Sequence, residues 1–137
     1  SSAASDVYKR QIIDCIATDH APHTSHDKDT TFDLASCGLI GLESCLGVVK
    51  KVLVDDENLK LLDLIKLLTV SPRKIMGFDN DLFKEGKEAE LVLFDEEKSW
   101  FFNENDINSK SKNSPFIGTQ LSGKVVHTIS KGIITTN

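Results

Sequence analysis

Histidines and one carboxylate gather near the start of the chain. Three of its four histidines, His20, His23 and His26, fall within seven positions, and Asp19 precedes the first of them. Clustering of this kind is typical of a metal site or an acid/base site. Because Pro22 would disrupt a helix, the spacing does not predict a helical ligand set. We therefore expect the cluster to lie on a loop.

Asp19 has the chemistry that hydrolysis of an amide requires. A carboxylate can bind a divalent metal ion that acidifies water, and it can carry a proton from that water to the leaving nitrogen. Composition alone leaves a second interpretation open, in which Asp19 caps the following turn through a side-chain oxygen. His23 is open in the same way between a metal ligand, an anion contact and a polar loop residue.

The residues before the cluster predict how it is positioned. Residues 12–17 are largely apolar and rich in β-branched side chains, as in a buried parallel strand, and the cluster follows at their C-terminal end. Barrel enzymes keep their chemistry at that end of their strands. A polar loop over residues 24–36 comes next. The first helix is expected over residues 39–54, with Glu43 and Lys50 lying off an apolar face formed by Leu42, Leu46, Val49 and Leu53.

Two more helices are expected after this one. The second begins in the acidic residues 55–58 and runs to Thr69 along an apolar stripe formed by Leu61, Leu62, Ile65 and Leu68. Ser71 is expected to cap the third helix, with Pro72 at the first helical position and Gly77 ending it in a left-handed conformation.

The later part of the chain is strand-like. Residues 90–95 and 100–102 read as strands, and residues 124–129 and 133–136 flank a tight turn in which Gly132 supplies the positive φ of a hairpin. Strand, helices and then strands indicate an α/β protein that passes into a small β domain.

Three regions follow from these patterns. Residues 1–11 match poorly with the rest and resemble a non-native, adapter-derived tail. Residues 12–79 are expected to form the α/β part of the chain and residues 80–137 the β domain.

Composition narrows the partners. The net charge of -5, with 39% hydrophobic and 27% charged residues, is typical of a globular protein and argues against nucleic acid or an anionic membrane surface. The chain has no apolar run long enough to span a bilayer and does not open on a signal peptide, so we expect a cytoplasmic protein. Its three cysteines lack a Cys-x-x-Cys spacing, which favours reduced thiols.

Residues 16–24 read Ile-Ala-Thr-Asp-His-Ala-Pro-His-Thr and resemble the signature of the dihydroorotases, which are cyclic amidohydrolases of the amidohydrolase superfamily. The resemblance continues, in the family's order and close to its spacing, through residues 38–44, 71–77, 86–95, 109–116 and 123–125. Two departures stand out. Ser36-Cys37 replaces the Pro-Phe of many members, which weakens the transfer of roles to that loop, and Glu90 replaces the commoner Asp.

The resemblance implies an α/β fold consisting of the C-terminal portion of a (β/α)8 TIM-like barrel, with strand eight and the following helices, joined to part of a small β-sandwich domain. It implies that Asp19 is a zinc ligand and the general base that moves a proton to the amide nitrogen. His23 matches the position that contacts the substrate carboxylate. Cys37 and Gly38 match a loop dipeptide that contacts substrate through main-chain groups.

The resemblance also implies two zinc ions per active site. Their remaining ligands, a His-x-His pair, a bridging lysine and two further histidines, are expected to precede Asp19, so this chain alone does not complete the metal site. His20 is assigned a hydrogen bond that orients its neighbours. Residues 109–113 are interpreted as a solvated connection that braces the β domain, with an anion site as the alternative.

The implied reaction is the reversible hydrolysis of the ring amide of dihydroorotate to N-carbamoyl-aspartate in de novo pyrimidine (UMP) biosynthesis. A homodimer or a complex with aspartate carbamoyltransferase is the expected assembly. The rival interpretations are an allantoinase or hydantoinase and a non-catalytic dihydroorotase-like subunit. The isolated chain is expected to be inactive, because part of a barrel exposes apolar faces.

Overall fold

The computed structural model describes residues 13–136, so the expected tail lies outside it. Helices come first along the chain and strands follow. The elements are α2 (Ser25–Lys28), α3 (Cys45–Val49), the π-helix η1 (Lys50–Asp56), α4 (Leu61–Leu68), α5 (Val70–Ile75), β1 (Leu91–Phe101), the 3-10 helix η2 (Glu104–Asp106), β2 (Gln120–Ser130) and β3 (Ile133–Thr136). The described residues therefore combine a helical region with a sheet that follows it.

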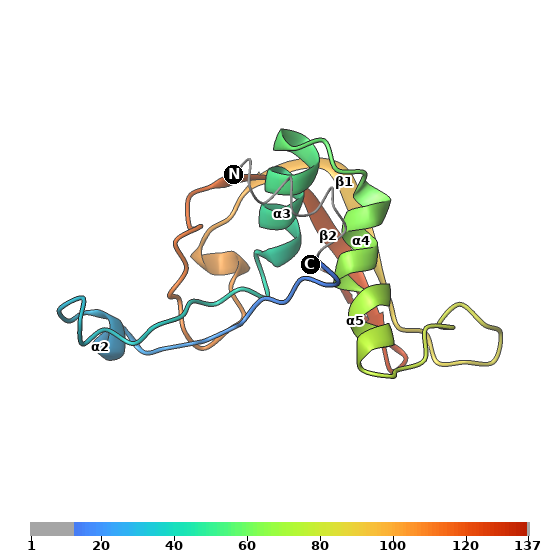
Figure 1. Cartoon of the computed structure of the whole chain (residues 1–137), viewed down its shortest axis with the longest axis horizontal. Coiled ribbons are helices and arrows are strands. Elements are labelled where there is room, and N and C mark those ends of the chain that lie inside the picture. The colour runs from blue at the N-terminus through green and yellow to red at the C-terminus, as the bar shows by residue number, and fades with distance from the viewer. Residues whose placement is uncertain (1–12, 137) are drawn as a thin grey trace.

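Two of the helical elements, α3 and η1, lie against the sheet, and a long arm leaves this body. α3 and η1 pack against β2, and α4 packs against η1 and α5. In Figure 1, α2 lies at the tip of an extended arm that carries the chain away from the sheet and back again. A second loop, after α5, extends from the opposite end of the molecule. Among the described residues, no helix has the length and apolar character needed to cross a bilayer.

The expected strand over residues 12–17 is not confirmed, because residues 13–17 pair with no strand in the described part of the chain. Ile16 donates its backbone N–H to the carbonyl of Leu67 on α4, 3.1 Å away. One parallel bridge forms further along, between His20 and Leu39. A parallel strand forms only by pairing with a neighbouring strand, and within residues 13–136 the single bridge between His20 and Leu39 is the only parallel pairing.

The expected helix over residues 39–54 begins later and ends later than predicted. Leu39 is taken up by the bridge to His20, and the helix starts only at α3 before it continues as η1 to Asp56. The acidic residues predicted to open a second helix therefore end this one. Lys50, placed on a polar face by its charge, is instead 7% exposed.

α4 confirms the expected second helix, but its buried face differs from the predicted stripe. Leu64 and Leu67 are the buried residues of α4, whereas Leu62 is 74% exposed. α5 follows after Thr69 without a polar linker, so Ser71 lies inside the helix and caps nothing. Gly77, with φ +71, confirms the predicted left-handed stop.

The three strands form one antiparallel sheet in the order β1-β2-β3. The two segments predicted at 90–95 and 100–102 are a single strand, β1, interrupted by register shifts. The predicted hairpin between β2 and β3 is confirmed, with Lys131 at φ +49 and Gly132 at φ +74. Two positive φ values in a two-residue loop are the geometry of a type I′ turn.

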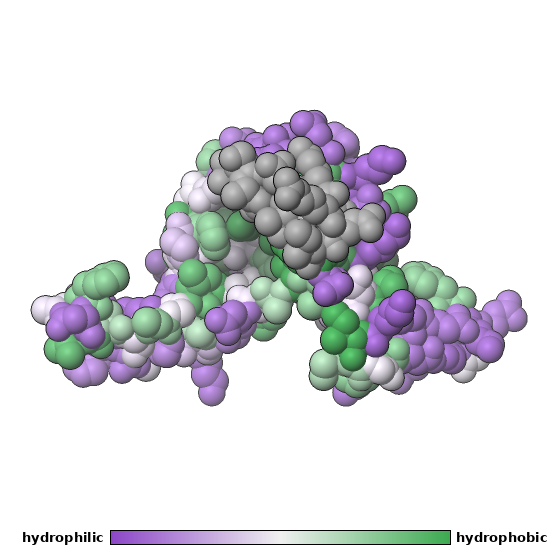
Figure 2. Space-filling view, in the orientation of Figure 1, coloured by the Kyte–Doolittle hydropathy of each residue, from purple (hydrophilic) through white to green (hydrophobic). Residues whose placement is uncertain are grey.

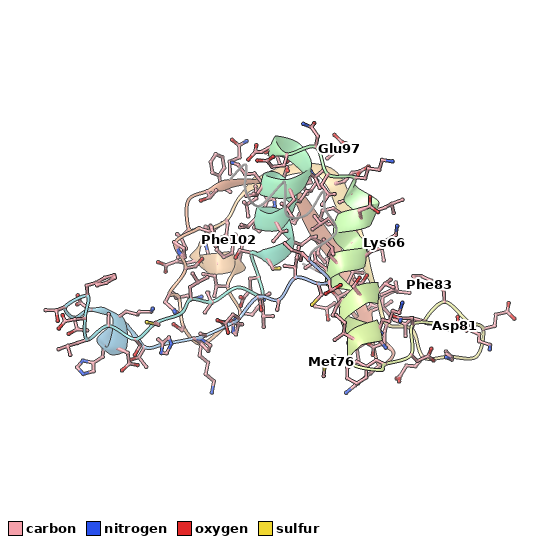
Figure 3. All side chains as sticks on the ribbon, in the orientation of Figure 1. Lys66, Met76, Asp81, Phe83, Glu97 and Phe102 are labelled. Atoms are coloured by element: carbon pink, nitrogen blue, oxygen red, sulfur yellow. The ribbon has the colours of Figure 1, made fainter. Side chains whose placement is uncertain are left out.

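The core lies where α3, the sheet and the connection between β1 and β2 meet. Its buried members are Ile40, Phe102, Ile107 and Leu121. Phe102, labelled in Figure 3, is fully buried and follows β1 directly. Ile40 lies beside the parallel bridge, so the core holds one edge of the region around Asp19.

Candidate functional site

Asp19 presents a carboxylate that is unpaired among residues 13–136. The residue is exposed, and its φ of +46 is a left-handed conformation that Asp adopts more readily than most residues. Within residues 13–136 the carboxylate has no hydrogen-bond or ion-pair partner. The alternative in which Asp19 caps the following turn is therefore wrong for the described residues. A solvent-facing carboxylate without an internal partner is available to an external ligand.

The backbone around Asp19 is held by a close approach of two segments. The N–H of Ala21 donates to the carbonyl of Leu39 at 2.9 Å. A Cβ on Gly41 would lie 3.1 Å from the carbonyl oxygen of Thr18, and a Cβ on Gly38 would lie 2.5 Å from Cβ of Ala21. Glycine at 38 and 41 is what allows the two backbones to come this close.

His20 ties the same segments together through its ring. Its Nδ1 accepts hydrogen bonds from the backbone N–H groups of Gly41 at 3.1 Å and Leu42 at 3.3 Å. Its Nε2 lies 3.4 Å from the hydroxyl of Ser109. The predicted role of His20, a hydrogen bond that orients its neighbours, agrees with these contacts.

Ser109 leads in turn to Glu43. The carboxylate oxygen Oε1 of Glu43 accepts from the Ser109 hydroxyl at 2.5 Å and from the Ser109 N–H at 2.7 Å. Partial burial acts to raise the pKa of Glu43, but the two hydrogen bonds from Ser109 outweigh it, and the pKa lies below its ordinary value. The other oxygen, Oε2, is buried with no partner in the described part of the chain. Glu43 is therefore a carboxylate directed at Ser109.

Asn113 joins the arm to the connection between β1 and β2. Its side-chain amide donates to the carbonyls of Ala21 at 3.1 Å and Gly38 at 3.4 Å, and its Oδ1 accepts from the N–H of His23 at 3.4 Å. The Ser111 hydroxyl donates to the carbonyl of His23. Residues 109–113 were predicted to brace the β domain, whereas these bonds brace the loop that carries the cluster.

His23 lines an open pocket of about 490 Å³, together with two lysines. Lys28 donates to the carbonyls of Ser36 and Gly38, and Lys112 donates to the carbonyls of Glu104 and Ile107. The other pocket residues are Ser25, Asp29, Ser111 and Asn113. Lys28 and Lys112 give the lining of this pocket positive charge, which favours an anion, even though the lining also contains Asp29.

The predicted substrate loop lies next to His23. A Cβ on Gly38, whose φ is +109, would be 3.5 Å from Nε2 of His23. Cys37 is exposed, and the N–H groups of Cys37 and Gly38 have no acceptor within residues 13–136. The structure therefore brings His23 and Gly38 together, while no hydrogen bond within residues 13–136 joins either of them to Asp19.

The described residues do not form a complete metal centre. Among residues 13–136, no group of three or more His, Cys, Asp or Glu side chains could hold a metal ion. His20 uses both ring nitrogens in hydrogen bonds within the chain. Zinc sites need three or four protein ligands, so the free carboxylate of Asp19 fits one ligand position in a site that needs others.

Sequence reasoning missed three residues of this region. Glu43 was assigned only to the polar side of a helix, and Ser109 and Asn113 only to a solvated connection. The only indication of their importance in the sequence is that each lies in a stretch that resembles the dihydroorotases. Residue type alone gives no reason to separate them from other surface polar groups.

The sequence profile of the amidohydrolase family matches residues 1–134 of the chain. The chain belongs to the amidohydrolase family. Among curated relatives of this amidohydrolase, the dihydroorotase of Chlorobaculum tepidum is 45% identical over 114 residues, covering 83% of this chain and 26% of the relative. The dihydroorotase of Caldicellulosiruptor saccharolyticus is 42% identical over 126 residues, covering 92% of this chain and 29% of the relative. The chain thus spans less than a third of the length of these two relatives.

Solved structures of hydantoinases share the fold of this amidohydrolase. D-hydantoinase (dihydropyrimidinase) from Thermus sp. matches 99% of this chain and 31% of its own, with a TM-score of 0.85 at 17% identity. L-hydantoinase (dihydropyrimidinase) from Arthrobacter aurescens matches 98% and 31%, with a TM-score of 0.85 at 24% identity. At these identities the likeness concerns the fold alone. It supports the predicted α/β fold of the amidohydrolase type, of which this chain covers about a third.

Proposed function

We propose that the complete protein carrying this chain is a dihydroorotase. It would hydrolyse the ring amide of dihydroorotate reversibly to N-carbamoyl-aspartate, in the cytoplasm, as a step of de novo pyrimidine biosynthesis. The observation that carries the proposal is the free carboxylate of Asp19, held at the junction of two segments within an Asp-His-Ala-Pro-His motif. Curated dihydroorotases that are 38–45% identical over most of this chain support the choice of substrate.

Asp19 has two roles in the proposed reaction. Its carboxylate contributes one ligand to a zinc site whose other ligands come from residues outside the described cluster. Zinc, once bound, would act as a Lewis acid and lower the pKa of water. Asp19 would accept a proton from the attacking water as a general base. It would then return a proton to the amide nitrogen as a general acid when the ring opens.

The pocket beside His23 is the proposed site for the substrate carboxylate. The imidazole can donate an N–H to an anion, and Lys28 and Lys112, which also line the pocket, add positive charge. The N–H groups of Cys37 and Gly38, without acceptors in the described structure, would add main-chain donors. Binding the substrate carboxylate here orients the ring without direct participation in bond breaking.

A comparison of substrates tests the proposal. The complete protein, loaded with zinc, is assayed for kcat/KM with dihydroorotate, allantoin and 5-substituted hydantoins. We expect dihydroorotate to be preferred by at least about 10²-fold, because a site that hydrogen-bonds a substrate group discriminates strongly against analogues that lack it. A preference for hydantoins would favour the activity named for the similar solved structures. Absence of turnover with all three would favour a non-catalytic subunit, and gel filtration with aspartate carbamoyltransferase would then test an assembly role.

A further inference from the structure

Three segments that are far apart in the sequence meet at the ring of His20. Gly41 and Leu42 approach Nδ1, and Ser109 approaches Nε2 from 89 positions away. Glu43 holds Ser109 from the other side by two bonds to one oxygen. The result is a chain of hydrogen bonds from the backbone at 41 and 42, through His20 and Ser109, to Glu43.

The direction of every bond in this chain is determined by its two ends. Backbone N–H groups can only donate, so Nδ1 of His20 must be without a proton. A carboxylate can only accept, so the Ser109 hydroxyl must give its proton to Glu43. The lone pairs of that hydroxyl then face Nε2, which carries the ring proton. The pattern assigns His20 to its Nε2–H tautomer.

We propose that Ser109 and Glu43 are positioning residues that hold His20 in this tautomer, so that its ring clamps residues 41 and 42 against the backbone that presents Asp19. Without the Ser109 hydroxyl, the Nε2 proton loses its acceptor, and only the two backbone N–H groups still oppose a proton on Nδ1. A proton on Nδ1 would point at the N–H groups of Gly41 and Leu42, and both hydrogen bonds to the ring would be lost. Asp19 directly precedes His20, so the position of its carboxylate follows the ring.

The contacts of Glu43 support a dedicated role. Both of its hydrogen bonds go to Ser109 through Oε1, and Oε2 has no partner in the described residues. A buried carboxylate oxygen without a partner costs free energy. Two bonds to one residue and an unpaired second oxygen are expected if the carboxylate serves to hold Ser109 in place, and through Ser109 the ring of His20.

The test uses the complete protein with Ser109→Ala, Ser109→Thr and the control Ser114→Ala. Ser114 belongs to the same connection, and its hydroxyl accepts from the N–H of Phe116 and does not contact His20. Selective ¹⁵N-histidine labelling, with His20 assigned by comparison with His20→Gln, reports the tautomer by NMR. Zinc content and kcat for dihydroorotate are measured on the same samples.

Ser109→Ala is expected to shift the His20 signals toward a tautomer mixture and to lower kcat or zinc affinity about 10- to 100-fold, the usual range for residues that orient metal ligands. Ser109→Thr, which keeps the hydroxyl, should restore the wild-type signals and most of the activity. Ser114→Ala should change neither. Unchanged His20 signals in Ser109→Ala, or a shifted tautomer with unchanged kcat and zinc content in an active enzyme, would overturn the proposal.

The positioning role rests on the proposed function, and the two fail differently. A wild-type protein that does not hydrolyse dihydroorotate while Ser109→Ala changes the His20 tautomer and the zinc affinity leaves the positioning role standing and removes the dihydroorotase proposal. An active wild type in which Ser109→Ala behaves like Ser114→Ala removes the positioning role alone.

Discussion

Asp19 has a left-handed backbone conformation, which most residues avoid. Its φ of +46 costs on the order of 1 kcal/mol for a residue with a side chain, and the hydrogen bond of Ala21 to Leu39 and the contacts of the His20 ring offset that cost. Asp and Asn accept this conformation best. An aspartate at this position is thus compatible with both the backbone and the proposed chemistry.

Asp19→Asn separates the charge of this residue from its shape. Asn keeps the size and tolerates the left-handed backbone, but it cannot accept a proton at neutral pH and is a poorer metal ligand. We expect kcat/KM for dihydroorotate in the complete protein to fall by at least about 10²-fold, as for loss of a general base. Zinc content should fall as well, with little change in thermal stability.

The matched control is Asp14→Asn, which removes an exposed carboxylate from the same segment. It should leave both activity and zinc content unchanged. Equal losses in the two variants would mean that negative charge in the segment matters and that Asp19 has no special role.

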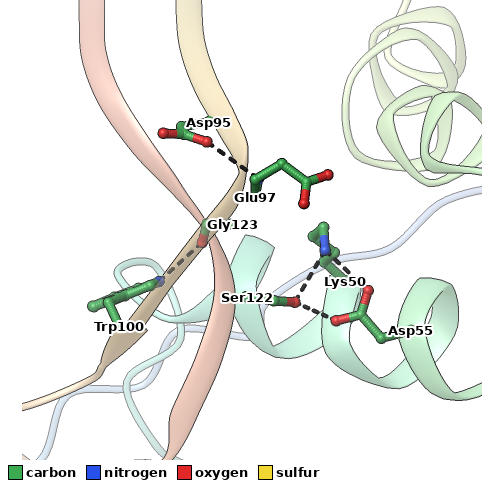
Figure 4. Close-up of polar contacts among 7 residues, drawn as sticks. All are labelled: Lys50, Asp55, Asp95, Glu97, Trp100, Ser122 and Gly123. Carbon is green, nitrogen blue, oxygen red and sulfur yellow. Dashed lines mark hydrogen bonds and ion pairs between the residues drawn. The ribbon is translucent and has the colours of Figure 1, made fainter.

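At the scale of elements, η1 is fastened to the sheet by a buried lysine. The side chain of Lys50 is 8% exposed and donates to Asp55 at 2.9 Å and to Ser122 on β2 at 3.0 Å (Figure 4). Ser122 also donates to Asp55. Lys50 and Asp55 are five residues apart, which matches one turn of a π-helix. A buried ammonium group requires such partners, so the cluster explains both the π-helical turn and its docking on β2.

Asp55→Asn is expected to destabilise the complete protein at neutral pH by about 1–2 kcal/mol. The cost stays below the 3–5 kcal/mol typical of a broken buried pair, because the Asp55 side chain is 35% exposed. Urea denaturation measures the difference. Asp63→Asn, which removes an exposed pair with Lys66, is the control and should cost no more than about 0.5 kcal/mol.

The same pair predicts a pH dependence. Partial burial acts to raise the pKa of Asp55, but hydrogen bonds from Ser122 and Lys50 and the charge of Lys50 outweigh it, and the pKa is lowered. A lowered carboxyl pKa stabilises the folded state above the unfolded pKa of about 3.9, and this contribution is lost as the pH falls through the folded value. The stability difference between wild type and Asp55→Asn should therefore shrink below about pH 4. A difference that grows there would contradict the ion pair.

At the scale of the molecule, large apolar side chains are unusually exposed. Phe32 is 99% exposed, Phe83 88% and Met76 66%. Figure 2 shows apolar surface on the arm around α2 and near the foot of α5, and Figure 3 places Met76 and Phe83 at the end of α5 and on the loop after it. Exposed apolar surface on this scale is typical of faces that contact other protein.

We predict that the 137-residue chain alone does not hydrolyse dihydroorotate, even with added zinc. The described residues bring together no three His, Cys, Asp or Glu side chains that could hold a metal ion, and the apolar faces remain open to water. The purified chain should also bind an apolar fluorescent dye such as ANS more strongly, per residue, than the complete protein does. Zinc-dependent turnover by the purified chain would overturn this prediction.

Local sequence patterns determined much of the fold. The apolar periodicity of residues 61–68 predicted α4, Gly77 marked the end of α5, and the Lys131-Gly132 turn predicted the final hairpin. These features depend on residues within a few positions of one another, so composition and spacing report them directly. The motif at residues 16–24 also identified Asp19 and His23 as the candidate residues, because residue identity is what a motif preserves.

Tertiary structure decided what surrounds those residues. The start of α3 moved to Cys45 because Leu39, Gly41 and Leu42 are held by the residues at 20 and 21. Lys50 is buried because it meets Ser122, 72 positions further on. The bonds that brace His20 and Ala21 come from Ser109 and Asn113, 89 and 92 positions away. Such bonds leave no local periodicity in the sequence, since they depend on which surfaces meet once the chain has folded.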